Sequence, residues 1–180
     1  MLLYEPNRGY RIRKVSTETI AEAYLVRGAL EGLACRLLAR AGMSARTEKT
    51  LAACVDHGRM LLENSETAFH HDEWREMNSS FHLAILEAAS NETLMVAFHT
   101  AEMHPMASVT FIPTLDSQPD FSSLRGAQAD HEHIFNALRA RDATRAASRM
   151  REHVEIAGEI LVQDLRGRPL QRGSKIKPVV

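Results

Sequence analysis

Cysteine is scarce in this chain, since Cys35 and Cys54 are the only two among 180 residues. They lack the C-x-x-C spacing of a redox motif or a thiolate zinc site. The sequence also has no segment that resembles a secretory signal, and no apolar run of about eighteen residues, the length that spans a membrane. We therefore expect a cytoplasmic protein with reduced cysteines and no membrane contact.

An excess of positive charge is also missing. The 22 lysines and arginines are balanced by 23 acidic residues, which gives a net charge of -1, whereas a domain that grips nucleic acid by itself usually carries a basic patch. The sequence contains no HExxH motif, nucleophile elbow or phosphate-binding loop. With 44% hydrophobic residues, the composition indicates one globular domain with a single core.

Strand-type alternation is confined to the N-terminus, where residues 10–15 follow a turn signal and are predicted to form a strand. Apolar residues then recur at helical spacing, with Thr17, Asn91 and Asp142 as expected N-caps. Prolines break this pattern between 108 and 122. We expect helices over residues 17–41, 44–63, 67–89, 91–104, 124–141 and 143–162. The predicted fold class is all-α, an antiparallel bundle of six to seven helices.

Two histidines lie at mirror positions around Asp142, the expected turn between the last two helices. His131 lies eleven residues before Asp142, and His153 eleven residues after it. At roughly 1.5 Å per residue, each side chain is about 16 Å from the turn, so the two imidazoles reach the same height. Asn78 and His82 are four residues apart in an earlier helix and share one of its faces. The spacing indicates a three-histidine site inside the bundle.

Several sequence blocks occur in a recognisable order. Residues 8–12 (RGYRI) are followed by residues 27–31 (RGALE), and the later blocks are Phe81-His82 with Asn91, Asp130-His131 leading into residues 134–138 (IFNAL), and residues 150–153 (MREH). Over residues 8–162 the chain resembles the C-terminal effector domain, or FCD domain, of the FadR-type branch of GntR transcription regulators. The first block is similar to the end of a DNA-binding wing, and the second to the signature of the family's first helix.

The resemblance implies three segments and a function. Residues 1–15 would be a remnant of the winged-helix wing and its linker, residues 16–165 the effector-binding and dimerisation domain, and residues 166–180 a flexible basic tail. It implies a homodimer that contacts DNA only through a winged helix-turn-helix domain, which we expect to be largely missing from this chain. The implied role is ligand sensing in a transcription regulator, with a small organic acid as effector and repression as the expected mode.

The resemblance also implies a metal site. In metal-binding members, the ligands are an aspartate, a histidine four residues later and two further histidines. His82, His131 and His153 match the histidine positions, and Asn78 stands where the family commonly has aspartate. The expected cofactor is a divalent metal, zinc or nickel, because imidazole suits both. An amide oxygen lacks the carboxylate's charge, so we expect weaker metal binding and an ion free to attract water or an anionic effector.

Other interpretations remain open at this stage. The histidines could line a polar pocket without metal, and Asn78 could satisfy hydrogen bonds within the bundle. Arg27 could clamp an effector carboxylate or pair with Glu31, one turn later. A metal-dependent hydrolytic enzyme would need a base, and Asp130 and Glu152 point about 100° away from their neighbouring histidines, as supporting or surface groups. A metal-free structural dimerisation module is a further alternative. We expect no enzyme.

Overall fold

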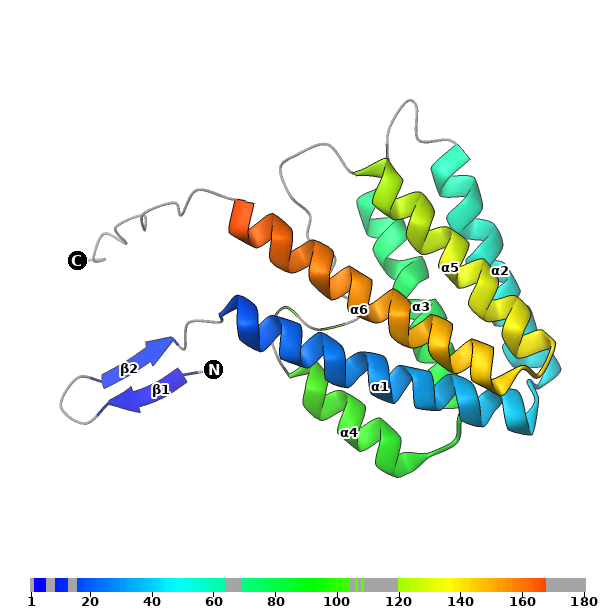
Figure 1. Cartoon of the computed structure of the whole chain (residues 1–180), viewed down its shortest axis with the longest axis horizontal. Helices are drawn as coiled ribbons and strands as arrows, with labels where there is room; N and C mark the ends of the chain where they lie inside the picture. Colours follow the sequence, from blue (N-terminus) through cyan, green and yellow to red (C-terminus); the bar gives the residue numbers. More distant parts are fainter. Residues whose placement is uncertain are drawn as a thin grey trace.

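The computed structural model describes residues 2–5, 9–12, 16–63, 69–103, 106, 108 and 120–167. Within these ranges it consists of a small hairpin and six helices (Figure 1). The helices pack into one bundle, which confirms the predicted all-α class. They are α1 (Thr17–Ala41), α2 (Ala45–Glu63), α3 (His71–Ala88), α4 (Glu92–Glu102), α5 (Phe121–Arg139) and α6 (Ala143–Gly167).

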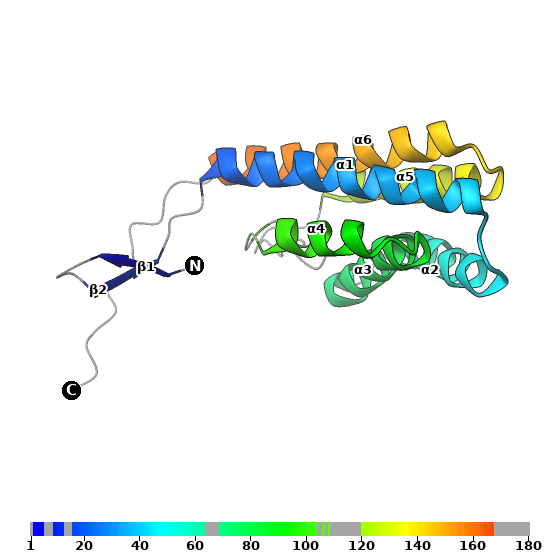
Figure 2. The same ribbon diagram turned by 90° about the horizontal axis from the view of Figure 1, so that it is seen from below.

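The six helices form two layers (Figure 2). One layer holds α1, α5 and α6, and the other holds α2, α3 and α4. The most extensive contact in the bundle joins α1 to α6, which run antiparallel, while α2 packs against α3 and α5, and α4 packs against α1. The apolar faces of the two layers therefore meet inside the bundle.

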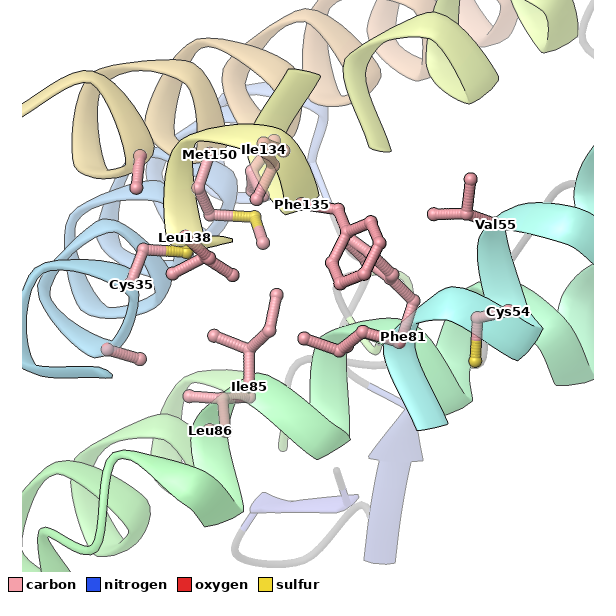
Figure 3. Packing of buried hydrophobic residues seen from close by; sticks show 14 of the residues in the cluster. Cys35, Cys54, Val55, Phe81, Ile85, Leu86, Ile134, Phe135, Leu138 and Met150 are labelled. Atoms are coloured by element: carbon pink, nitrogen blue, oxygen red, sulfur yellow. The ribbon is translucent and has the colours of Figure 1, made fainter. Parts of the chain in front are cut away.

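The hydrophobic core lies between the two layers, and Figure 3 shows the part of it around α3, α5 and α6. Phe81 and Ile85 of α3, Ile134 and Leu138 of α5, and Met150 of α6 are all buried there. Each such side chain contributes roughly 1.5–3 kcal/mol when it leaves water. This packing holds the two layers together, and because a histidine follows Phe81 in the sequence, it also fixes the position of that histidine.

Polar side chains set the helix starts. As predicted, Asn91 and Asp142 accept backbone hydrogen bonds from the residue three positions later, at 2.9 and 3.0 Å. The first cap was predicted one residue too late, since Ser16 rather than Thr17 accepts this bond, at 3.2 Å. Asp120 caps α5, so that helix begins three residues earlier than predicted. A single capping oxygen thus moves an expected boundary by up to a turn.

Two further boundaries differ from the sequence-based expectation. α3 was predicted from residue 67 but begins at His71, because the ring of Phe69 packs edge-on against His71 and Phe121, with centroids 4.8 and 5.5 Å apart. α6 was predicted to end at 162 but continues to Gly167. Residues 166–167 of the expected tail are therefore helical, and residues 168–180 lie outside the described ranges.

The N-terminal hairpin pairs β1 (Leu2–Glu5) with β2 (Gly9–Ile12) in antiparallel register, with Leu2 opposite Ile12. One strand was predicted here, over residues 10–15, and residues 13–15 lie outside the described ranges. β1 was missed because its sequence, LLYE, begins with two consecutive apolar residues and has no alternation to indicate a strand.

Glycines let α1 and α6 approach closely. A Cβ atom added at Gly32 of α1 would lie 2.9 Å from the carbonyl oxygen of Ala147, and one at Gly158 of α6 would lie 2.6 Å from the side chain of Tyr24. Both distances are shorter than a Cβ atom tolerates. Gly32 therefore lies directly against the backbone of α6, and Gly158 lies directly against the side chain of Tyr24. The residues that α1 presents to the bundle interior are therefore held close to those of α6.

Candidate metal centre

Three buried histidines meet in the middle of the bundle. His82 comes from α3, His131 from α5 and His153 from α6, and their exposed fractions are 2%, 0% and 6%. One ring nitrogen from each lies within 4.8 Å of the others, and Nε2 of His82 is 3.3 Å from Nε2 of His153. The structure therefore brings together the three histidines that the sequence pattern singled out.

The hairpin between α5 and α6 sets the height of two of these rings. Arg141 adopts a left-handed conformation, with φ of 54°, and reverses the chain, after which Asp142 caps α6. The ring centroids of His131 and His153 lie 4.8 Å apart, so the equal height expected from their mirror spacing is observed. His82 approaches from the other layer, with its ring centroid 5.5 Å from that of His131.

Two carboxylates lie behind the histidines. Glu31 of α1 contacts Nδ1 of His82 through Oε2, and Asp130 Oδ2 lies 3.5 Å from Nδ1 of His153. An ionised carboxylate can only accept a hydrogen bond, so Nδ1 of His82 donates and Nε2 keeps its lone pair. Carboxylates that orient imidazoles in this way are typical of the surroundings of metal-binding histidines. The arrangement leaves the Nε2 atoms of His82 and His153 facing the centre.

The imidazole of His131 provides the test of whether a metal fits. Among the described residues, neither of its ring nitrogens has a hydrogen-bond partner, although the ring is fully buried. Its neighbours include the ring of Phe81, at a centroid distance of 4.4 Å. A buried polar group without a partner is costly, so such groups usually bind an ion, a water molecule or a ligand. The three imidazoles form a donor set of the kind that zinc and nickel prefer.

Electrostatics favour the neutral form of two of the rings, His131 and His82. Burial lowers the pKa of His131 well below its usual value, and the nearby His153 and His82 lower it further. Burial also lowers the pKa of His82, although Glu31 opposes this effect. For Glu31, burial acts to raise the pKa, but the charges and hydrogen bonds of Arg27 and His82 outweigh it and bring the pKa to about 2. At neutral pH the site therefore combines neutral imidazoles at His131 and His82 with an ionised carboxylate at Glu31.

A cavity of about 170 Å³ adjoins the histidines, and its lining includes His82, His153, Asn78 and Arg27. Asn78 lies one helical turn before His82 on α3, on the face predicted from the four-residue spacing. The four polar residues come from α1, α3 and α6. A molecule in this cavity could therefore contact the histidines, the amide of Asn78 and the guanidinium of Arg27.

Arg27 pairs with Glu31, which is one of the two roles that the sequence suggests for it. Its Nε and Nη2 atoms both donate to Oε1 of Glu31, at 3.0 and 2.8 Å, and both residues are buried. The guanidinium also lies 5.0 Å from the ring centroid of Tyr24. Because Arg27 lines the cavity as well, its pairing with Glu31 does not remove it from the reach of a bound anion.

The family model of the FCD domain matches residues 22–156. The chain belongs to the FCD domain family. The match spans α2 to α5 and most of α1 and α6, including all three histidines. It confirms the resemblance inferred from the sequence blocks and identifies the chain as an effector-binding regulatory domain of the kind found in GntR-family regulators.

Two solved structures share the fold of this FCD domain. E. coli McbR/YncC superposes with a TM-score of 0.70 at 18% identity, covering 91% of this chain and 77% of that chain. A GntR-family transcriptional regulator from Pseudomonas syringae pv. tomato str. DC3000 superposes with a TM-score of 0.62 at 18% identity, covering 93% and 66%. At this identity the likeness concerns the fold alone. No curated protein matches the chain, and no helix within the described ranges is long and apolar enough to cross a membrane.

Two carboxylates of this FCD domain contact the histidines more closely than the sequence pattern predicts. Glu31 was considered only as a partner of Arg27, but it also contacts His82. The sequence predicts either a supporting or a surface role for Asp130, and the structure places this carboxylate beside His153. The contact of Asp130 across the α5–α6 hairpin follows from the same mirror spacing that predicted the histidine pair. The sequence therefore contained enough information to predict this contact.

The remaining described histidines of the FCD domain lie away from this cluster, as expected. His57 and His70 each approach Glu73 at 3.6 Å on partly or fully exposed faces, and His99 lies 3.7 Å from Glu102. His133, two residues after His131, is exposed. Among the described residues, only the buried trio brings three potential ligand atoms together.

Proposed function

We propose that this FCD domain is the effector-sensing and dimerisation domain of a cytoplasmic transcription regulator. In this proposal His82, His131 and His153 hold a divalent metal, zinc or nickel, and a small carboxylate binds beside it. The single observation that carries the proposal is the imidazole of His131, which is fully buried, has no hydrogen-bond partner among the described residues, and faces two other imidazoles. A bound ion would remove the cost of burying these nitrogens.

Asn78 makes the proposed site more attractive to anions. A ligand set of three neutral imidazoles and one amide oxygen leaves the full positive charge of a divalent ion, whereas an aspartate would cancel part of it. The ion would supply this charge to the carboxylate of the effector. Arg27, which lines the same cavity, would add a second positive group with a fork geometry suited to carboxylates.

The regulatory part of the proposal concerns the homodimer. An effector that binds one packing arrangement of two FCD domains better than another shifts the equilibrium between them. Residues 1–15 would transmit this shift from the domain over residues 16–165 to a winged-helix DNA reader, with release of DNA as the expected response. Operator affinity of the full-length regulator, measured at fixed salt with and without the effector, tests this step. Unchanged affinity would contradict it.

The disposition of the carboxylates favours sensing over hydrolysis. A hydrolytic zinc enzyme needs a base that can reach the attacking water. The two carboxylates nearest to the cluster, Glu31 and Asp130, instead contact the outer Nδ1 atoms of His82 and His153. They are thus placed to orient the imidazoles.

The proposal is tested by elemental analysis of the purified chain after incubation with zinc or nickel. We expect close to one metal ion per chain in the wild type and almost none in the double variant His131→Ala, His153→Ala. His133→Ala is the matched control, because it removes an exposed histidine from the same helix, and it should bind metal normally. Circular dichroism verifies that all three proteins are folded. A wild-type protein that takes up no metal would contradict the metal site.

A further inference from the structure

The cavity beside the histidines changes character along its length. Its polar lining residues are His82, His153, Asn78 and Arg27. The rest of the lining is mainly apolar and includes residues from four helices: Tyr24, Trp74, Leu124, Val154 and Leu161. Besides the phenol of Tyr24, the lining contains two hydroxyl groups, those of Ser108 and Ser123. A molecule that fills the cavity would therefore meet polar partners at its head and mostly hydrocarbon along its body.

The spacing along α3 and α6 separates apolar lining residues from the histidines. Trp74 lies two helical turns before His82 on α3, and Leu161 lies two turns after His153 on α6. At 1.5 Å per residue, each apolar residue is about 12 Å along its helix from the corresponding histidine. Trp74, Val154 and Leu161 are buried. The lining therefore extends from the two histidines along both helices to buried apolar residues.

The size of the cavity limits the body of the ligand. Its volume is about 170 Å³, and an apolar protein cavity of about 150 Å³ accommodates a single benzene molecule. Buried hydroxyl or carboxylate groups on the ligand would find few partners here, and each unpaired one weakens binding by roughly five-fold or more.

From these observations we infer that the ligand of this cavity is a monocarboxylate with an apolar body of about five carbons or one aromatic ring. Sugar acids and polycarboxylates fit less well. The inference rests on the proposed function, since it takes the carboxylate to be held at the polar end. It adds the chemical class of the remainder of the molecule, which is set by the apolar walls of the cavity.

Calorimetric titration of the zinc-loaded full chain with four acids tests this inference. Acetate supplies the carboxylate alone, hexanoate adds an apolar chain, gluconate has the same six carbons with hydroxyls, and adipate adds a second carboxylate. Each buried methylene tightens binding by up to about four-fold, so hexanoate should bind at least ten-fold more tightly than acetate, by this rough estimate. Gluconate or adipate binding as tightly as hexanoate would overturn the inference.

A variant that fills the cavity provides a second test. Ala127 lines the cavity on α5, one turn before His131. Ala127→Leu should reduce the preference for hexanoate over acetate to about three-fold or less, by loss of most of the methylene burial. Ala129→Leu, an exposed position on the same helix, is the matched control. A full hexanoate preference in Ala127→Leu would overturn the inference.

The same titrations on the zinc-free chain separate this inference from the proposed metal site. If the chain takes up no zinc but still prefers hexanoate to gluconate, the metal site is wrong and the ligand class stands. If zinc binds and acetate binds, but hexanoate gains nothing, the ligand class is wrong and the metal site stands. If none of the acids binds with or without zinc, the inference is overturned.

Discussion

Asn78 is the residue at which this chain departs most clearly from the ligand set implied by its family. Replacing it with aspartate would add a negative charge one helical turn before His82. A charge about 4 Å from a divalent ion contributes at least 1 kcal/mol or so, even at a water-like dielectric constant. We therefore expect Asn78→Asp to bind zinc roughly ten-fold more tightly and carboxylates more weakly.

Competition with a chelator of known affinity would measure the change in zinc binding, and calorimetry would measure carboxylate binding. Asn136→Asp makes the same chemical change at an exposed position of α5 and should alter neither value. Zinc affinity that is equal in Asn78→Asp and the wild type would show that residue 78 is outside the coordination sphere.

The buried imidazole of His131 should make the stability of the metal-free chain depend on pH. Its pKa is lowered in the folded state, chiefly by burial, and is about 6.5 in an unfolded chain. Below about pH 6.5, the unfolded state therefore takes up a proton that the folded state refuses, and the free energy of unfolding falls as pH falls, until the folded pKa is reached. Above about pH 6.5, His131 is neutral in both states and no longer makes the free energy of unfolding depend on pH.

Urea denaturation of chelator-treated protein between about pH 7 and pH 5 would measure this dependence. His131→Phe keeps a ring of similar size beside Phe81 and cannot titrate. Relative to the variant, the wild type should lose up to about 1.4 kcal/mol of unfolding free energy per pH unit in this interval. Parallel pH profiles for the two proteins would mean that His131 is protonated equally in the folded and unfolded states.

Individual residues of the site differ in how far the sequence could predict them. His131 and His153 belong to one hairpin, so their proximity follows from local geometry and could be predicted by counting residues. The contact of Glu31 with His82 joins α1 of one layer to α3 of the other. Its formation depends on how the layers pack, which the periodicity of a single helix does not specify.

At the scale of helices, the close packing of α1 against α6 should be sensitive to a single methyl group. Gly158→Ala gains helix propensity, but its Cβ would lie 2.6 Å from the side chain of Tyr24. Overpacking of this kind typically costs about 1–3 kcal/mol, so we expect a net loss of stability. A Cβ atom added at Gly126 of α5 would meet nothing within 4 Å among the described residues, and Gly126→Ala should be stabilising by about 0.5–1 kcal/mol.

Thermal and urea unfolding of the two variants against the wild type would measure both effects. The comparison removes the common gain in helix propensity, because both substitutions replace glycine with alanine inside a helix. If Gly158→Ala were as stable as Gly126→Ala, the two helices would be further apart than the structure shows.

Helix boundaries were predictable to the extent that they depend on local chemistry. The caps at Asn91 and Asp142 follow from residue type and position, and they were predicted. The start of α3 depends on the packing of Phe69 against Phe121, a residue far away in the sequence, and was therefore placed too early. β1 forms a pair with β2, and its own sequence gives no independent indication of a strand.

For the whole molecule, a metal at the histidine cluster would join the two layers, since His82 lies in one and His131 and His153 in the other. A ligand that binds only the folded state at about 1,000 times its Kd stabilises that state by about 4 kcal/mol. We expect zinc to raise the Tm of the wild type by several degrees and to leave that of the double variant His131→Ala, His153→Ala unchanged. Differential scanning calorimetry with zinc and then with excess chelator measures both shifts.

His133→Ala should respond to zinc as the wild type does, which separates binding at the buried cluster from binding at surface histidines. An equal rise in Tm for the double variant would assign the stabilisation to some other site.

The glycine contact between α1 and α6 also bears on how much of the site exists before any ligand arrives. Backbones that touch without intervening side chains have little freedom to slide or rotate, so Arg27 and Glu31 on α1 and His153 on α6 are assembled when the chain folds. His82, on α3, is the member contributed by the other layer. The conformational entropy lost on binding would then fall mainly on α3, and most of the site would be preorganised at no further cost in affinity.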